Sequence, residues 1–230
     1  MEIRLASLTE GAASATGTVV IIDVFRAFTA AAVAFSRGAR RIVMVADLGH
    51  ALALRAAGVG DYCIGERRGA KPPGFDFGNS PAELSCATLD GKILIQTTTN
   101  GTAGINAAAR AERIYAGAFV SAEATVRAIQ RAAPPIVTLV AMGREGITRA
   151  DEDELCALYL RSRLEGRTPD TAALFRLAAT MVPPPNAARV ASGDYDVRDR
   201  ELAFQLDLVP FAIAVRRDGD LLIAEPHATV

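Results

Sequence analysis

Short apolar runs alternate with Ala-rich segments of helical periodicity along most of the chain. Runs bounded by turn residues are typical of buried strands, and apolar residues recurring every three or four positions are typical of helices. The pattern predicts strands over residues 18–23, 41–45, 62–66, 92–96, 114–117 and 136–142. It predicts helices over residues 27–37, 47–57, 79–89, 121–131 and 151–164, and an Ala-rich helix that follows residue 102 and runs through Ala111. This alternation predicts βαβ units around a mostly parallel sheet.

The pattern is weaker after Gly166. Pro169 predicts the start of another helix, and the three prolines at 183–185 predict a rigid connection. Residues 211–215 and 221–224 flank Asp218-Gly219 and predict a closing hairpin. A chain of 230 residues is within the range of one α/β domain, so we expect a single domain over residues 1–230, with residues 165–230 as a C-terminal elaboration.

The composition and charge of the chain exclude several classes of protein. Half of the residues are apolar, which excludes a disordered chain, and 25 basic residues against 26 acidic ones give no reason to expect a nucleic-acid or membrane partner. No apolar stretch reaches the ~18–20 residues that span a bilayer. Glu2 and Glu10 stand where a signal peptide has a basic head and an apolar block, so we expect a cytoplasmic protein. The odd and widely spaced cysteines are expected to be reduced core thiols: Cys63, Cys86 and Cys156.

Polar residues gather where the predicted strands end, which is where ligands bind in an open α/β sheet. Asp23 and Arg26 follow the first strong strand, Glu66 and Arg67 follow another, and the pair Glu152-Asp153 follows the last glycine loop. Each has a plainer interpretation: Asp23, for example, serves equally well as the cap of the next helix.

Residues 97–102, Thr-Thr-Thr-Asn-Gly-Thr, link a strand to a helix and present hydroxyls and backbone N–H groups that suit a phosphate. The alternative is a Thr-rich turn that only caps its helix. The common phosphate motifs are absent: no Walker A sequence occurs, Gly69 and Ser162 stand where a Cys-x5-Arg loop needs arginine, and Phe25 stands where an Asp-x-Asp motif needs a carboxylate.

Acidic residues offer the hard oxygen ligands that suit Mg²⁺. A zinc site is not expected, because the chain has only two histidines, His50 and His227. The candidate metal ligands are Asp23, Glu66, Asp76, Glu152 and Asp153.

Five short segments, together covering about the first two thirds of the chain, follow one another in order: residues 19–27 (VVIIDVFRA), residues 65–67 (GER), residues 74–81 (GFDFGNSP), residues 98–102 (TTNGT) and residues 152–153 (ED). Together they resemble the 2-phosphosulfolactate phosphatase family, Mg²⁺-dependent enzymes of coenzyme M biosynthesis. The chain departs from the family pattern at Met142, in a segment where the family often has Cys-Ala-Gly, and at Phe25 and Phe28, where smaller or aliphatic residues are usual.

The resemblance implies a three-layer α/β/α fold with a mixed sheet and a site for a small phosphorylated organic acid. On this basis we expect Asp23, with one or more of the other candidate carboxylates, to hold Mg²⁺. Arg26 and Arg67 are expected to hold substrate oxygens by forked hydrogen bonds, with Asp23 and Glu66 completing the catalytic set. The expected substrate-binding residues are Asn79, Ser80, Thr98, Thr99, Asn100, Gly101 and Thr102.

Three alternatives stay open from sequence. The substrate is 2-phosphosulfolactate or another small phospho-hydroxy acid. A non-catalytic phosphate-binding module would keep the threonine-rich turn but needs few carboxylates beside it, because carboxylates repel a phosphate unless a cation intervenes. A structural oligomer subunit would pair Asp23 with Arg26 and Glu66 with Arg67. A homo-oligomer is compatible with each of them.

Overall fold

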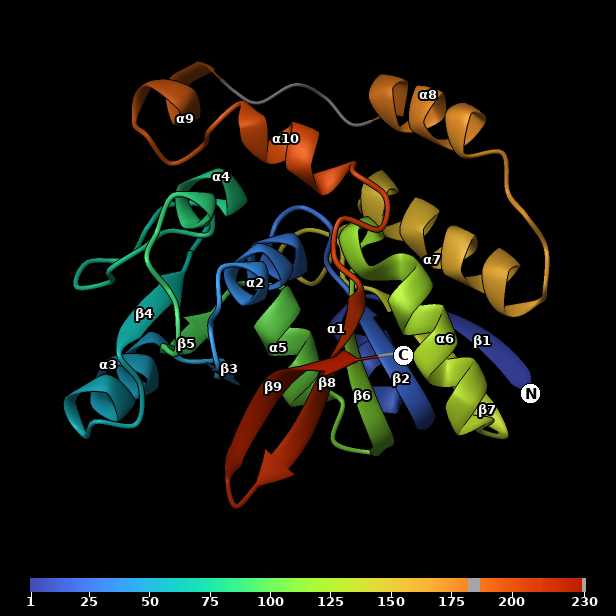
Figure 1. The fold of residues 1–230 in the computed structure, drawn as a ribbon, viewed down its shortest axis with the longest axis horizontal. Helices are drawn as coiled ribbons and strands as arrows, with labels where there is room; N and C mark the ends of the chain where they lie inside the picture. The colour runs from blue at the N-terminus through green and yellow to red at the C-terminus, as the bar shows by residue number, and fades with distance from the viewer. Residues whose placement is uncertain (182–186, 229–230) are drawn as a thin grey trace.

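The structure is a computed structural model that describes residues 1–181 and 187–228 (Figure 1). Its strands are β1 (Glu2–Ser7), β2 (Gly17–Ile22), β3 (Arg41–Met44), β4 (Tyr62–Gly65), β5 (Ile93–Thr97), β6 (Ala111–Gly117), β7 (Ile136–Ala141), β8 (Phe211–Asp218) and β9 (Leu221–Ala228). Its α-helices are α1 (Leu8–Ser14), α2 (Ala27–Ser36), α3 (Leu48–Ala56), α4 (Pro81–Ser85), α5 (Gly101–Ala107), α6 (Ala122–Ala132), α7 (Asp151–Leu164), α8 (Thr171–Met181), α9 (Ala187–Ala191) and α10 (Arg198–Ala203).

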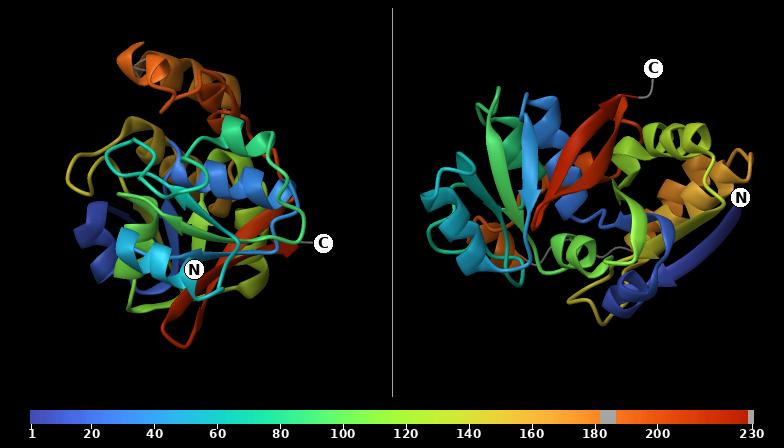
Figure 2. Two further views of the ribbon diagram at one scale, coloured as in Figure 1. Left: turned by 90° about the vertical axis from the view of Figure 1, so that its left-hand side faces the viewer. Right: turned by 90° about the horizontal axis from the view of Figure 1, so that it is seen from below.

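The nine strands form one sheet in the order β1-β7-β2-β6-β8-β9-β3-β5-β4. Two groups of parallel strands, β1-β7-β2-β6 and β3-β5-β4, are joined by the β8–β9 hairpin, which is antiparallel to both neighbours. Figure 2 shows this hairpin, in red, between the two groups. The prediction of a mixed, mostly parallel sheet is therefore confirmed.

The hairpin predicted around Asp218-Gly219 forms, and the structure adds its position in the sheet. β8 pairs with β6 and β9 pairs with β3, so the hairpin lies in the middle of the sheet. Consecutive residues of both strands are buried, Ala212 and Ile213 in β8 and Leu222 and Ile223 in β9. Burial of consecutive residues means that both faces of the hairpin strands are covered, as expected for a sheet with layers on both sides.

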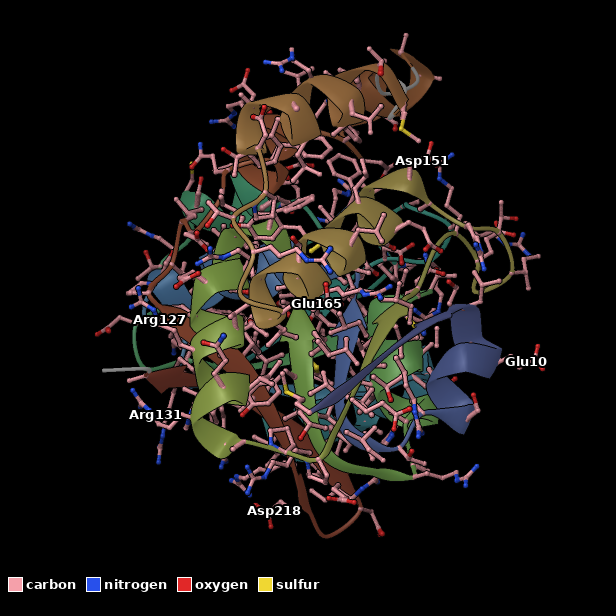
Figure 3. All side chains as sticks on the ribbon, turned by 90° about the vertical axis from the view of Figure 1, so that its right-hand side faces the viewer. Glu10, Arg127, Arg131, Asp151, Glu165 and Asp218 are labelled. Carbon is pink, nitrogen blue, oxygen red and sulfur yellow. The ribbon has the colours of Figure 1, made fainter. Side chains whose placement is uncertain are left out.

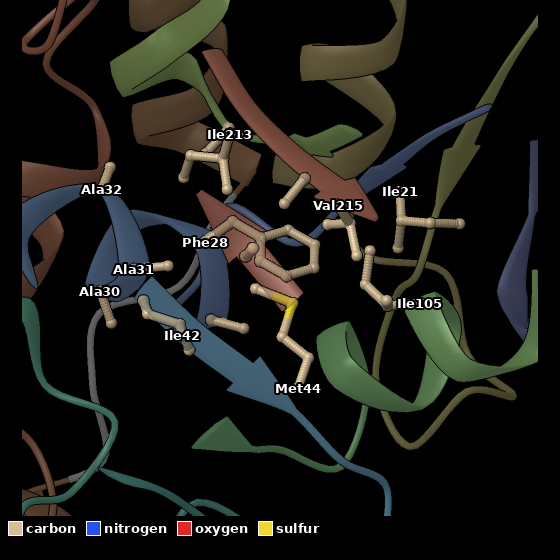
Figure 4. Packing of buried hydrophobic residues seen from close by; sticks show 14 of the residues in the cluster. Ile21, Phe28, Ala30, Ala31, Ala32, Ile42, Met44, Ile105, Ile213 and Val215 are labelled. Atoms are coloured by element: carbon tan, nitrogen blue, oxygen red, sulfur yellow. The ribbon is translucent and has the colours of Figure 1, made fainter. Parts of the chain in front are cut away.

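Alternate side chains of the central strands enter cores on opposite faces of the sheet. In β2, Val19 and Ile21 pack in a core with α1, α2 and α5, whereas Val20 and Ile22 pack in a second core with α6 and α7. Figure 4 shows Phe28 of α2 in the first core, among residues from both groups of strands. A third, smaller core lies between α3 and strands β3 to β5. These layers confirm the predicted three-layer α/β/α arrangement.

Most predicted elements are present within a few residues of their predicted bounds, and α7 begins and ends at the predicted residues. Four acidic residues in its first turn favour the positive end of the helix dipole, and Figure 3 shows it from Asp151 towards Glu165. The predicted helix through Ala111 ends at Ala107, because Ala111 pairs with Gly17 as the start of β6. The helix expected to end near residue 89 is the shorter α4.

The two terminal regions of the chain are where the structure differs most from the sequence prediction. Strand β1 and helix α1 were not predicted, and β1 is an edge strand with three exposed residues that gives a weak apolar signal. Helix α8 confirms the helix predicted after Pro169, and Asp170 accepts the N–H of Ala173 at its start. Helices α8, α9 and α10, orange in Figures 1 and 2, lie together on one side of the molecule. The proline connection at 183–185 lies outside the described residues.

Two further sequence predictions can be compared with the structure. Cys63 and Cys156 are buried free thiols as expected, but Cys86 is exposed because it follows the last turn of the short helix α4. Among residues 1–181 and 187–228, no helix has the length and apolar character needed to cross a membrane.

Candidate functional site

Four buried carboxylates meet where the parallel strands end. Asp23 follows β2, Glu66 follows β4, and Glu152 and Asp153 lie in the first turn of α7, after β7. Each is at most 7% exposed. Burial raises the pKa of Asp23 to about 7, and the negative charges of Glu66 and Glu152 contribute to this rise. Burial and the charges of Asp23 and Glu152 also raise the pKa of Asp153, so Asp23 lies close enough to each of the other three carboxylates for their charges to repel.

Asp23 lies between the starts of two helices. Its Oδ1 accepts the N–H of Ala27 at 3.1 Å, which is the helix-capping contact of the plainer interpretation. The N–H of Gly101, at the start of α5, also lowers the pKa of Asp23 as a hydrogen-bond donor. A Cβ on Gly101 would lie 2.9 Å from Oδ2 of Asp23, so this glycine permits the close approach of α5 to the carboxylate. The cap and the cluster are therefore formed by the same side chain.

Glu66 and Asp153 hold the surrounding loops with both of their carboxylate oxygens. Glu66 accepts the N–H of Gly69 and the N–H of Thr99, each at 2.6 Å. Asp153 accepts the N–H of Val24 at 2.8 Å and that of Gly143 at 2.9 Å. Loops that follow β2, β4, β5 and β7 are thus fixed around Asp23 by two carboxylates.

Glu152 differs from these two. Its Oε2 is buried and has no hydrogen-bond partner among the residues that the structure describes. Burial raises the pKa of Glu152, and the charge of Arg144 acts in the opposite direction. An unpartnered buried carboxylate oxygen beside a second buried carboxylate, Asp23, is a donor set that fits a hard cation. No group of three or more His, Cys, Asp or Glu side chains in the described ranges is arranged to hold a metal ion, so at most two would be direct ligands.

The polar groups of the threonine-rich turn at residues 97–102 form hydrogen bonds mainly with one another. Thr98 N–H donates to Oγ1 of Thr102 at 2.7 Å, and Thr102 N–H donates to Oγ1 of Thr98 at 3.0 Å. Thr99 donates both its N–H and its hydroxyl to Glu66. Oδ1 of Asn100 is buried and unpartnered in the described structure. The helix-capping alternative thus accounts for Thr98 and Thr102, whereas Asn100 keeps a polar atom without a partner.

The two arginines of the predicted set bind protein acceptors. Arg26 donates to Oδ2 of Asp199 at 2.8 Å and to the carbonyl of Asp194 at 3.0 Å. Arg67 donates to the carbonyl of Glu66, to the carbonyl of Ala46 and to the hydroxyl of Thr97. Among the ion pairs of the described residues, neither Asp23–Arg26 nor Glu66–Arg67 occurs, so the pairs that the structural-subunit alternative requires are not formed.

The remaining predicted residues lie further from Asp23 along the fold. Ser80 caps α4 by accepting the N–H of Glu83, and its hydroxyl donates to Asp199 at 2.6 Å. The neighbouring Asn79 has a buried Oδ1 without a partner in the described part of the chain. The structure does not bring Asp76 to the cluster: it pairs with Arg55 at 2.6 Å and accepts the N–H of Cys63. The loop after β4 runs back along that strand and returns Asp76 to the strand's second residue.

Sequence reasoning gave no role to Asp199, although it joins Arg26, Ser80 and the N–H of Ala82 through one fully buried carboxylate. Arg26 and Asp199 are 173 residues apart, and no spacing or periodicity signals a contact over that distance. Tyr195 was also missed: its ring contacts that of Phe25 at a tilt of 41° and lies under the Arg26 guanidinium.

The raised pKa values predict how the stability of the metal-free protein depends on pH. The pKa of Asp23, about 7, is above its value of about 3.9 in an unfolded chain. The folded state therefore binds the proton more tightly between these values, and stability is lost as the pH rises through about 7. We expect urea denaturation in EDTA to give a smaller free energy of unfolding at pH 8 than at pH 5. Asp23→Asn is expected to reduce this difference, and an equal or larger free energy at pH 8 would contradict the assignment.

Comparison with known proteins adds independent evidence. The model of the 2-phosphosulpholactate phosphatase family matches residues 4–190. A relative from Thermoplasma volcanium, named as a probable 2-phosphosulfolactate phosphatase, is 38% identical over 151 residues, which are 66% of this chain and 69% of the relative. A protein of the same name from Bacillus subtilis is 35% identical over 157 residues, 67% of each chain. The matched range begins within β1 and extends beyond α7, so it contains all four clustered carboxylates.

Proposed function

Since this chain belongs to the 2-phosphosulpholactate phosphatase family and is a phosphoric monoester hydrolase, we propose that it hydrolyses 2-phosphosulfolactate to sulfolactate and phosphate with the help of Mg²⁺. The observation that carries the proposal is the cluster of four buried carboxylates at the strand ends, in which Oε2 of Glu152 has no partner among the described residues. A site for an anionic substrate that contains so much negative charge needs a cation.

Asp23 and Glu152 are the residues that we propose as direct ligands of Mg²⁺. Burial raises the pKa of both, Glu152 has a free buried oxygen, and Mg²⁺ accepts one or two carboxylates with water in its remaining positions. Glu66 and Asp153 support them by holding the loops, because both oxygens of each accept N–H groups. When bound, the ion would polarise the phosphate and lower the pKa of an attacking water.

The chain's own groups orient the substrate and the loops around it. Asn100 is proposed to donate the N–H groups of its side-chain amide to the phosphate, because its Oδ1, which is buried without a partner in the described structure, can only accept. Gly101 keeps α5 close to Asp23, and the Thr98–Thr102 contacts hold the turn rigid. Arg26 and Arg67 add positive charge while their N–H groups anchor neighbouring segments. A preorganised site of this kind stabilises charge that develops during phosphoryl transfer.

Hydrolysis of another small phospho-hydroxy acid uses the same site and stays the second candidate. A non-catalytic phosphate-binding module is disfavoured by the four carboxylates, since without a cation they repel the anion that such a module holds. The cytoplasmic location, the single domain over residues 1–230 and a homo-oligomeric state stay predictions.

Phosphate release from purified protein tests the proposal. We expect turnover of 2-phosphosulfolactate with Mg²⁺ and its loss in EDTA, because the buried negative charges then repel the substrate. The assay includes a panel of phospho-hydroxy acids under the same conditions. Turnover of a different ester alone would change the substrate, and release that is unaffected by EDTA would contradict the metal site. Anion binding without any release would support the binding module instead.

A further inference from the structure

Two arginines beside the carboxylate cluster have unengaged side chains. Arg68 follows β4 and Arg144 follows β7, and both are exposed. Neither guanidinium forms a hydrogen bond or an ion pair with any residue in the described ranges, and the two arginines contribute hydrogen bonds through their backbone. Arg68 N–H donates to Oγ1 of Thr99 at 3.2 Å, and Arg144 N–H donates to the carbonyl of Thr148 at 2.6 Å. Their side-chain donors are therefore available to a ligand.

The carboxylate cluster itself fixes the loops that carry these arginines. Glu66 binds the N–H of Gly69, the residue after Arg68, and Asp153 binds the N–H of Gly143, the residue before Arg144. The charge of Arg144 also lowers the pKa of Glu152, against the larger effect of burial, which places this cation within electrostatic reach of the cluster. The backbone on one side of each arginine is thus held by a carboxylate of the cluster, which keeps the free guanidinium near the site.

The sheet order places the two arginines on opposite sides of Asp23. β7, which precedes Arg144, is the neighbour of β2 on one side, whereas β4, which precedes Arg68, lies beyond β6, the hairpin, β3 and β5 on the other. Arg68 has a φ of 52°, a left-handed conformation that glycine adopts with less strain. A strained backbone conformation persists where surrounding contacts hold it in place. Here the hydrogen bonds that Glu66 accepts from Gly69 and Thr99 hold the conformation of Arg68.

The substrate of the proposed reaction carries a phosphate, a carboxylate and a sulfonate, about four negative charges at neutral pH. Arg26 and Arg67 direct their N–H groups to protein acceptors, so they do not offer a free fork to two further acid groups. Arg68 and Arg144 do, and a guanidinium fork matches the oxygens of a carboxylate or a sulfonate.

We propose that Arg68 and Arg144 determine substrate specificity by binding the carboxylate and the sulfonate, one each, while the phosphate lies at Asp23. This inference rests on the proposed function and extends it: the enzyme selects a phosphate ester that carries two further acid groups. A simple phosphate monoester gains nothing from either arginine, and an ester with one acid group gains from one of them.

The experiment compares Arg68→Gln and Arg144→Gln with wild type on three substrates: 2-phosphosulfolactate, 2-phospholactate without the sulfonate, and phenyl phosphate without either group. Each variant is expected to raise KM for 2-phosphosulfolactate about tenfold or more, as for the loss of a charge-assisted hydrogen bond, with little change in kcat. One variant should affect 2-phospholactate and the other should not, and neither should alter phenyl phosphate. Arg217→Gln, an exposed arginine of β8, is the matched control and should change nothing.

Binding of the product sulfolactate, measured by calorimetry with Mg²⁺ present, gives a readout without turnover. We expect about tenfold weaker binding by each variant than by wild type. The inference is overturned if the variants bind sulfolactate as wild type does, or if they lose activity equally on phenyl phosphate. If wild type binds no sulfolactate and prefers another ester, the proposed function fails, and so does the assignment of a sulfonate to either arginine.

Discussion

Asp23→Asn is expected to lower kcat/KM of the phosphatase reaction by roughly a thousandfold while the protein stays folded. The substitution keeps the side-chain oxygen that accepts the N–H of Ala27, so the start of α2 is preserved. It removes a negative charge that interacts with those of Glu66, Glu152 and Asp153, and with it a proposed ligand of Mg²⁺. Repulsion among the buried carboxylates also falls, so we do not expect a loss of stability above pH 7.

Asp76→Asn provides the control for this measurement. Asp76 was also a predicted metal ligand, but it pairs with Arg55 and with the N–H of Cys63 at the start of β4. We expect this variant to retain most of its kcat/KM and to lose only the contribution of a partly exposed ion pair, about 1 kcal/mol or less. Kinetic assays and urea denaturation of both variants check these outcomes. Turnover near that of wild type for Asp23→Asn would show that the metal assignment is wrong.

The difference between these two aspartates illustrates what the sequence can predict. Strand ends of a parallel sheet meet at one edge, and this rule places Asp23, Glu66 and the Glu152-Asp153 pair together from apolar patterning alone. The structure places them accordingly. Asp76 is separated from Glu66 by a loop without periodicity, and the direction of such a loop depends on contacts that local sequence does not encode. The loop pairs with its own strand at Phe77 and Ile64, and this turns Asp76 away from the cluster.

The same limit applies to the C-terminal part of the chain. Alternation predicted the β8–β9 hairpin, but its place between β6 and β3 depends on long-range pairing. Edge strand β1 gave little signal, because exposed edge positions lack a regular apolar pattern. The capping role of the threonine-rich turn, at Thr98 and Thr102, followed from local sequence, since a cap and its helix are adjacent in the chain.

Asp199→Asn is expected to lower the free energy of unfolding by about 3–5 kcal/mol. The Asp199 carboxylate is fully buried and accepts hydrogen bonds from Arg26, Ser80 and the N–H of Ala82. Its neutral analogue leaves the Arg26 guanidinium, itself only 5% exposed, without a counter-charge in the interior. A buried charge that loses its partner costs far more than an exposed one, because water cannot replace the lost interaction.

Asp196→Asn is the matched control, because Asp196 lies three residues away and forms an exposed ion pair with Arg198 at 2.6 Å. We expect its loss to change the free energy of unfolding by about 1 kcal/mol or less. Urea denaturation of both variants under the same conditions makes the comparison, and similar losses for the two would contradict the structural role of Asp199. A large loss for Asp199→Asn alone would mean that α10, in the part of the chain with the weakest sequence pattern, holds Arg26 and the start of α4 in place. The C-terminal third would then contribute to the stability of the site although it supplies none of the clustered carboxylates.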